Sequence, residues 1–207
     1  KYLKQKATDG EGGTESDRLI RHIVRSKHTS TLEHITFTFA IEGLSRAALA
    51  QLTRHRVGFS YSVQSQRYVR FGSDDKTEGF DFILPKSVAD RGRKDILFEN
   101  TLSKYLRVMD TIQETYDFLR ENGIPAEDAR MVLPNATTCN LVMTVNIRSL
   151  LDFYHKRKAG NGAQWEIAEL AEKLKEEVIK KEAWLEPFFN EQQNETAKQK
   201  GGKLNDY

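Results

Sequence analysis

The chain has 207 residues, of which 38% are hydrophobic and 10% aromatic, enough for the core of one large domain. Its 32 Lys+Arg and 30 Asp+Glu leave a net charge of only +2, which argues against a non-specific nucleic-acid binder. Its single cysteine, Cys139, excludes an internal disulfide and a cysteine-based zinc site. Apolar runs such as Leu141–Val145 are too short to span a bilayer. We therefore expect a single domain over residues 1–207, cytoplasmic, with neither nucleic-acid nor membrane partners.

Helices alternate with separated groups of strands along the chain. The glycine-rich start, 1–14, and the polar tail, 190–207, are expected to be mobile. Apolar stripes and capping residues predict helices over 16–26, 44–53, 95–121, 125–130, 149–156 and 163–181. Alternating β-branched and aromatic residues predict strands over 35–42, 63–71, 80–84 and 137–145, and 86–93 reads as a charged connector. This order predicts an α+β fold, an antiparallel sheet flanked by helices that include one long central helix.

The stretch Gln51–Arg70, QLTRHRVGFSYSVQSQRYVR, concentrates arginines, a histidine and several hydroxyl and amide side chains. Arginine binds phosphate or carboxylate through planar, bidentate contacts, and serine hydroxyls and backbone N–H groups complete such sites. Three more arginines, Arg130, Arg148 and Arg157, stand near the ends of other predicted elements. Together these residues predict a shared pocket for an anionic ligand.

Several kinds of chemistry lack their usual sequence patterns. The five histidines show no HxH or HExxH spacing, so no metal site is expected. Cys139 lies in a segment of buried character, which favours packing over nucleophilic attack. There is no GxSxG elbow, and no Rossmann or P-loop glycine pattern. The reactive chemistry is therefore expected to come from a bound cofactor.

The segment RHRVGFSYSVQSQRY, residues 54–68, resembles the RHR…S signature of the flavin-dependent thymidylate synthases, the thymidylate synthase-complementing proteins. Four more segments resemble landmarks of that family in the same order: STLEHITFTF, ARMVLP, TVNIRSLLDF and KRKAGNGAQWEI. The resemblance implies the fold of that family and a homotetramer that converts dUMP to dTMP. It also implies that FAD is the cofactor, that NADPH reduces it, that methylenetetrahydrofolate donates the one-carbon unit, and that no enzyme cysteine attacks the substrate.

The same resemblance implies a role for individual residues. The residues expected to bind the flavin are Ser30, Glu33, Arg54, His55, Arg56, Asn146 and Arg148. The residues expected to bind dUMP are Gln51, Arg54, Ser65, Gln66, Arg67, Arg130 and Arg157. Arg157 is expected to orient and polarise the pyrimidine, with His55 and Ser65 also at the catalytic centre. The loop from Ser65 to Arg67 is expected to enter the pocket of a neighbouring subunit.

The sequence departs from the family pattern in three places. Eight residues separate the RHR motif from Ser65, one more than is common. The loop after Arg157 is one residue longer, and Ala168 follows AQWEI where arginine is frequent. These departures motivate one alternative, an inactive member that only binds flavin or nucleotide. A second alternative is a single-stranded RNA-binding module that would use the arginines together with Tyr61, Tyr68 and Phe71 as stacking platforms. The near-neutral charge argues against it.

Overall fold

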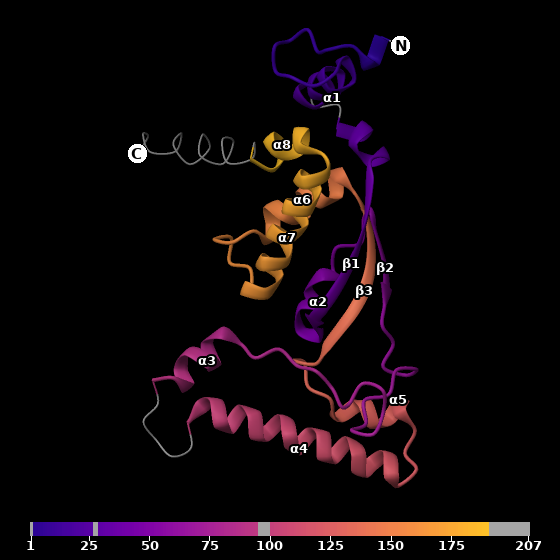
Figure 1. Ribbon diagram of the computed structural model, residues 1–207, viewed down its shortest axis with the longest axis vertical. Coiled ribbons are helices and arrows are strands. Elements are labelled where there is room, and N and C mark those ends of the chain that lie inside the picture. The colour runs from indigo at the N-terminus through magenta and orange to yellow at the C-terminus, as the bar shows by residue number, and fades with distance from the viewer. Residues whose placement is uncertain (1, 27–28, 95–99, 191–207) are drawn as a thin grey trace, which may run out of the picture. The chain divides into compact units, whose positions relative to one another are not determined.

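The computed structural model describes residues 2–26, 29–94 and 100–190 (Figure 1). In chain order, its helices and strands are α1 (Glu15–Arg25), β1 (Thr36–Ser45), α2 (Arg46–Leu52), β2 (Phe59–Val63), α3 (Lys86–Gly92), α4 (Thr101–Glu121), α5 (Ala126–Ala129), β3 (Thr138–Asn146), α6 (Ile147–Arg157), α7 (Trp165–Lys181) and α8 (Glu186–Asn190). Short 3-10 turns are η1 (Tyr2–Lys4), η2 (Thr29–His34), η3 (Arg130–Val132) and η4 (Ala183–Leu185). The tail after residue 190 and the predicted start of the long helix at 95–99 lie outside the described residues. Within these ranges, no helix combines the length and apolar content that a membrane crossing requires.

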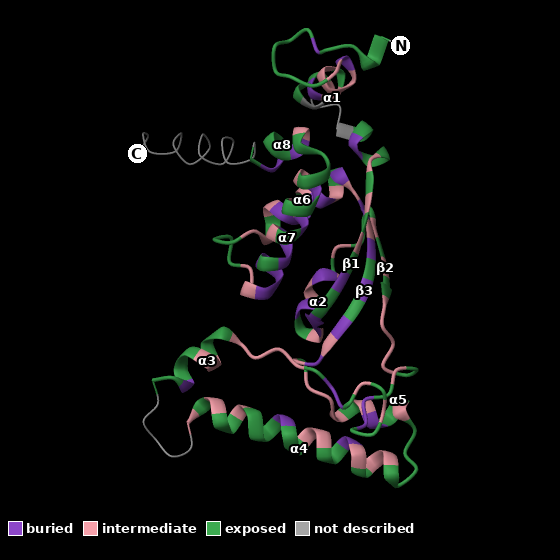
Figure 2. Cartoon of the chain, in the orientation of Figure 1, coloured by how far each residue is buried: buried purple, intermediate pink, exposed green. Residues whose placement is uncertain are grey.

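The three strands form one antiparallel sheet in the order β1-β3-β2. The register of β3 against β2 follows from two hydrogen bonds, Asn146 N to Gly58 O at 3.1 Å and Gln64 N to Asn140 O at 2.9 Å. Burial alternates along β3 (Figure 2), as expected for a strand with one face on a core. Cys139 belongs to the buried face, 1% exposed, and its Sγ donates to Leu44 O. The predicted α+β fold with a helix-flanked antiparallel sheet is confirmed.

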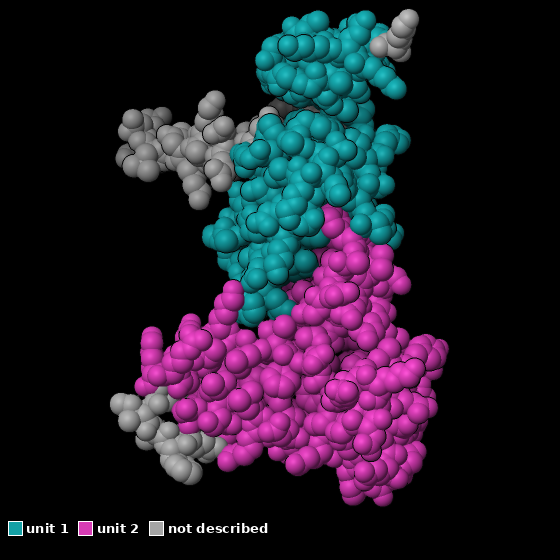
Figure 3. Space-filling view, in the orientation of Figure 1, with its two compact units in different colours: residues 1–38, 55–60, 144–207 teal, residues 39–54, 61–143 magenta. Residues whose placement is uncertain are grey.

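The chain divides into two compact units (Figure 3). Unit 1 comprises residues 1–38, 55–60 and 144–207, and unit 2 comprises residues 39–54 and 61–143. Every strand of the sheet has residues in both units, because the unit boundaries fall within the strands. That all 207 residues work as a single functional domain stays a prediction.

Each unit has its own buried side chains. In unit 1 the facing helices α6 and α7 bury Phe153 and Ile167, each 0% exposed. In unit 2, α4 buries Met109 and Tyr116 in a cluster with Phe71. The stripe predicted for the long helix therefore does face a core. This helix begins where Asn100 Oδ1 accepts from Ser103 N at 2.8 Å, a side-chain cap of the kind that starts helices.

Two strand predictions after β2 are wrong, and so is one predicted connector. The strand predicted over 63–71 shares only Val63 with the observed strand β2, which ends at that residue. The backbone turns after Val63, because Ser65 Oγ accepts from Arg67 N and Ser65 O accepts from Val69 N. The strand predicted over 80–84 is reduced to a single bridge, from Phe82 to Thr137. Residues 86–93 are not a connector but helix α3, which begins after a proline.

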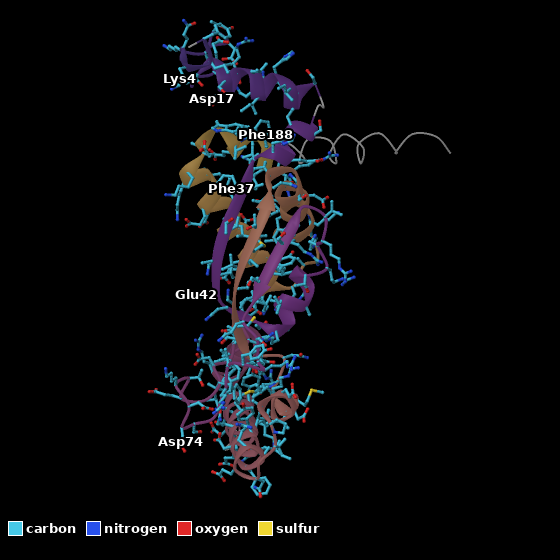
Figure 4. All side chains as sticks on the ribbon, turned by 90° about the vertical axis from the view of Figure 1, so that its right-hand side faces the viewer. Lys4, Asp17, Phe37, Glu42, Asp74 and Phe188 are labelled. Atoms are coloured by element: carbon cyan, nitrogen blue, oxygen red, sulfur yellow. The ribbon has the colours of Figure 1, made fainter. Side chains whose placement is uncertain are left out.

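Residues 2–14 lead into α1 through specific contacts. Lys6 and Thr14 form an isolated antiparallel bridge. Thr14 then caps α1: Asp17 N donates to Thr14 Oγ1 at 3.4 Å, and Thr14 N donates to Asp17 Oδ2 at 2.6 Å. Lys4 and Asp17 mark this segment in Figure 4. The predicted helix start is thus confirmed, whereas the mobility expected of residues 1–14 stays a prediction.

Glu15, at the start of α1, is the buried centre of this segment. It is 1% exposed, and its carboxylate accepts hydrogen bonds from Thr8 N at 2.8 Å, Arg18 Nε at 2.6 Å and Tyr2 Oη at 3.1 Å. Hydrogen bonds to the charged form lower the pKa of a carboxyl. The bonds from Thr8 first, and then from Arg18, hold the pKa of Glu15 at about 2, below its usual 4.5.

We expect acid to release this segment. Because the pKa of Glu15 is lower in the folded state, its stabilisation is complete above pH 4.5 and is lost as the pH falls towards 2. Hydrogen exchange of the α1 amides, corrected for intrinsic rates, should speed up between pH 4.5 and about 2, and Glu15→Gln should show the fast exchange already at neutral pH. Glu176→Gln, an exposed carboxylate on α7, is the control. Equal protection of α1 in wild type and Glu15→Gln at neutral pH would contradict this assignment.

Candidate active site

His55 and Arg157, which are far apart in the sequence, are hydrogen-bonded in unit 1. Arg157 Nε donates to His55 Nε2 at 3.0 Å. A guanidinium nitrogen cannot accept, so the imidazole receives this bond as the neutral form with its proton on Nδ1. Phe153, one turn before Arg157 on α6, forms a T-shaped contact with the His55 ring, with 4.9 Å between the ring centroids. The last two turns of α6 thus hold His55 by a hydrogen bond and by an aromatic contact.

Arg157 lies in the last turn of α6, where a cation is favoured by the helix dipole. Its side chain is half-buried, and Nε is committed to His55. The two terminal amino groups of a guanidinium form a planar fork that suits a carbonyl or an anion. The geometry therefore leaves Arg157 equipped to polarise a ligand oxygen while His55 fixes its orientation.

The backbone at Gly58 passes directly against the first turn of α6. Gly58 has φ of +74°, and a Cβ at this position would lie 2.1 Å from Ser149 Oγ and 2.5 Å from Asn146 Nδ2. Asn146 caps α6, because its Oδ1 accepts from Ser149 N at 2.9 Å. Asn146, one of the predicted flavin contacts, therefore uses its side-chain oxygen to cap α6. Its side-chain amide nitrogen is the group that could donate to a ligand.

Two further predicted flavin residues form an ion pair with each other. Glu33 on η2 binds Arg148 in the first turn of α6, and both side chains are about half exposed, 48% and 52%. Ser30 is exposed on the same 3-10 turn as Glu33, and Arg56 is exposed next to His55. Unit 1 therefore holds every predicted flavin residue except Arg54, which belongs to unit 2.

In unit 2, Arg67 and Arg130 are connected through one acidic residue. Glu127 Oε2 pairs with Arg67 Nε at 2.8 Å, and Arg130 Nε donates to Glu127 O at 3.0 Å. Glu127 was not predicted from the sequence, because the predicted anion pocket called for donors rather than carboxylates, although its position three residues before Arg130 could have suggested it. Arg67 also lies over the ring of Tyr68, 5.6 Å from its centroid.

The remaining predicted nucleotide residues also belong to unit 2. Ser65 uses its hydroxyl oxygen within the turn, and Gln66 next to it is half-buried. Gln51 lies in the last turn of α2, and Arg54 follows that helix exposed to solvent. Within the described chain, the structure records no side-chain hydrogen bond or ion pair from Gln51 or Arg54 to Arg67 or Arg130.

Ala168, one of the three departures from the family pattern, is a core residue. It is 6% exposed on the buried face of α7, beside Ile167 and Ala171. An arginine would not fit there without moving its neighbours, because interiors are close-packed. The departure therefore concerns packing of α7 rather than an exposed side chain.

The comparisons with known proteins agree with these features. The family model described as thymidylate synthase complementing protein matches residues 2–182. The chain belongs to this family. The flavin-dependent thymidylate synthase of Geobacter sulfurreducens is 46% identical over 144 residues, which are 70% of this chain and 56% of that protein. The chain thus spans little more than half the length of this curated relative.

Solved structures of the family extend the comparison to the fold. The UMP/dUMP methylase PolB from Streptomyces cacaoi, bound with 5-Br UMP, superposes with a TM-score of 0.66 at 26% identity, covering 88% of this chain and 85% of that one. Thymidylate synthase X (ThyX) from Helicobacter pylori, with FAD and dUMP, gives a TM-score of 0.56 at 29% identity, covering 78% and 76%. The fold class expected from the resemblance is therefore confirmed.

Gly58 offers a test of the contact that positions the residues predicted to bind the flavin. Gly58→Ala should lower the melting temperature and weaken flavin binding, because it adds a clash of about 1–3 kcal/mol to left-handed backbone strain of about 1–2 kcal/mol. Gly160→Ala is the matched control: Gly160 also has positive φ, +88°, but nothing lies within 4 Å of its added Cβ. Equal losses of melting temperature in the two variants would refute the clash.

Proposed function

We propose that this protein is a flavin-dependent thymidylate synthase, which converts dUMP to dTMP by reductive methylation. Methylenetetrahydrofolate would supply the one-carbon unit, NADPH would reduce the FAD, and no cysteine of the protein would attack the pyrimidine. Membership of the family supports this proposal. The observation that carries it is the hydrogen bond from Arg157 to His55, because it assembles two residues of separate family landmarks into one centre. The burial of Cys139 fits chemistry without a thiol nucleophile.

The groups gathered in unit 1 fit a flavin dinucleotide. Exposed Arg56 and Arg148 supply the cations that a diphosphate needs, and Asn146, packed against Gly58, offers an amide donor. Ser30 and Glu33 offer a hydroxyl donor and a carboxylate acceptor for sugar or ring atoms. FAD bound there would supply the hydride.

The residues of unit 2 would hold the nucleotide. Arg67 and Arg130, with the backbone N–H groups of the loop from Ser65, would bind the phosphate of dUMP, while Gln51, Arg54 and Gln66 would bind its remaining polar groups. Arg157 would stand against a carbonyl oxygen of the uracil, which gains negative charge as hydride arrives. A preformed cation at that position stabilises the transition state.

The role of Arg157 can be measured directly. Arg157→Ala should reduce kcat for dTMP formation by about 10²- to 10³-fold, the range for removing one stabilising donor, while the protein stays yellow with bound FAD. Lys156→Ala, which removes the adjacent exposed cation, should keep at least half of the activity. Unchanged turnover in Arg157→Ala would rule out this role, and a colourless wild-type protein that ignores added FAD would sink the proposed function altogether.

We further propose a homotetramer in which the loop from Ser65 to Arg67 completes a neighbouring subunit's pocket. Arg67→Ala and Arg157→Ala should each be inactive alone, because each destroys one half of every site. Mixing the two after subunit exchange should restore activity, since some pockets then combine an intact half from each variant. No recovery after proven exchange, by mass spectrometry of mixed tetramers, would place both residues in a pocket formed by one subunit.

The alternative of an inactive flavin or nucleotide binder makes a different prediction. Such a protein would bind FAD and dUMP but form no dTMP when NADPH and methylenetetrahydrofolate are added. A single-stranded RNA-binding module would bind oligonucleotides and ignore FAD. The core position of Ala168 removes one of the observations that motivated the inactive reading.

A further inference from the structure

Glu127 contacts both arginines that are assigned to the nucleotide phosphate. Its Oε2 lies 2.8 Å from Arg67 Nε, and its own carbonyl oxygen accepts from Arg130 Nε at 3.0 Å. One residue of α5 thus touches both arginines. The pair with Arg67 is half exposed, with side-chain exposures of 53% for Arg67 and 47% for Glu127, so an incoming anion can reach the guanidinium.

We propose that Glu127 is an internal counter-anion that weakens phosphate binding at Arg67, because an incoming phosphate must displace it or oppose it. This inference rests on the proposed function, because it takes Arg67 as a phosphate ligand. The negative charge of Glu127 opposes a phosphate in both of the ways in which it can approach the Arg67 guanidinium. If the phosphate takes the Nε edge, it replaces the carboxylate. If it takes the terminal amino groups, two anions then share one guanidinium and repel each other.

The number of contacts that an anion makes decides whether it binds in spite of Glu127. A free phosphate ion contacts only the arginines, and there it competes with a carboxylate that the chain holds nearby. A nucleotide gains additional contacts through its base and sugar, and these offset the competition. Glu127 therefore lowers the affinity of every phosphate for Arg67. Only a ligand that also contacts the rest of the pocket then binds tightly enough to occupy the site.

A purely positioning role predicts the opposite sign. If Glu127 serves to hold the Arg67 guanidinium in the right orientation above Tyr68, its removal loosens Arg67 and weakens phosphate binding. The Tyr68 ring already holds this guanidinium at 5.6 Å, and the Ser65 turn fixes its backbone. These two contacts remain when Glu127 loses its charge, and they favour the competitive role.

The test compares Glu127→Gln with Asp128→Asn in the full chain loaded with FAD. Both variants remove one negative charge from α5, but Asp128 makes no ion pair or side-chain hydrogen bond among the described residues. Calorimetric titration with dUMP should give a Kd about two- to fivefold lower for Glu127→Gln, the range expected for one exposed ion pair. Asp128→Asn should stay within twofold of wild type, and the Kd for deoxyuridine, which lacks the phosphate, should not change in either variant.

Inorganic phosphate provides a probe that does not depend on the nucleotide. It should raise the melting temperature of Glu127→Gln by more than that of wild type or Asp128→Asn, and the difference should vanish when Arg67→Ala is added. A weaker or unchanged affinity of Glu127→Gln for both dUMP and phosphate would overturn the inference. If wild type fails to bind dUMP while the phosphate series behaves as expected, the proposed function fails and the role of Glu127 stands.

Discussion

The close approach of Gly58 to the first turn of α6 is the constraint on which the position of the predicted flavin-binding residues depends. The backbone N–H of Asn146 donates to Gly58 O, and the added Cβ of any other residue would meet Ser149 or Asn146. This contact fixes the start of β2 against the end of β3. His55, three residues earlier, then meets Phe153 and Arg157 in the last two turns of α6. The absence of a side chain at Gly58 thus determines where His55 and Arg157 come into contact.

Three of the predicted site arginines are each held by one neighbouring side chain. Arg157 is tied by a neutral imidazole, Arg148 by Glu33, and Arg67 by Glu127. Half-exposed pairs of this kind add little to stability. Their effect is to hold long side chains in defined places before a ligand arrives, so that less conformational entropy is lost on binding. The near-neutral total charge of the chain is consistent with arginines that are matched locally.

Local signals were enough to predict most helices and the strand β3. The start of α1, the stripe of α4 and the alternation of β3 depend on neighbours within a few residues, and all three are found in the structure. The predicted strand after Val63 fails because the hydroxyl of Ser65 competes for a backbone N–H, which hydrophobic alternation does not register. The bond from Arg157 to His55 could be predicted only through family resemblance. Since 102 positions separate the two residues, no local pattern places them side by side.

The buried thiol of Cys139 has a consequence for chemical sensitivity. It is the only cysteine in the sequence, it is 1% exposed, and it donates to a backbone carbonyl from inside the sheet. Alkylating agents and mild oxidants act on accessible thiolates, so burial protects the thiol of Cys139 from them while the sheet is folded. Electrophilic reagents directed at a nucleophilic cysteine would therefore react with Cys139 only after the sheet opens.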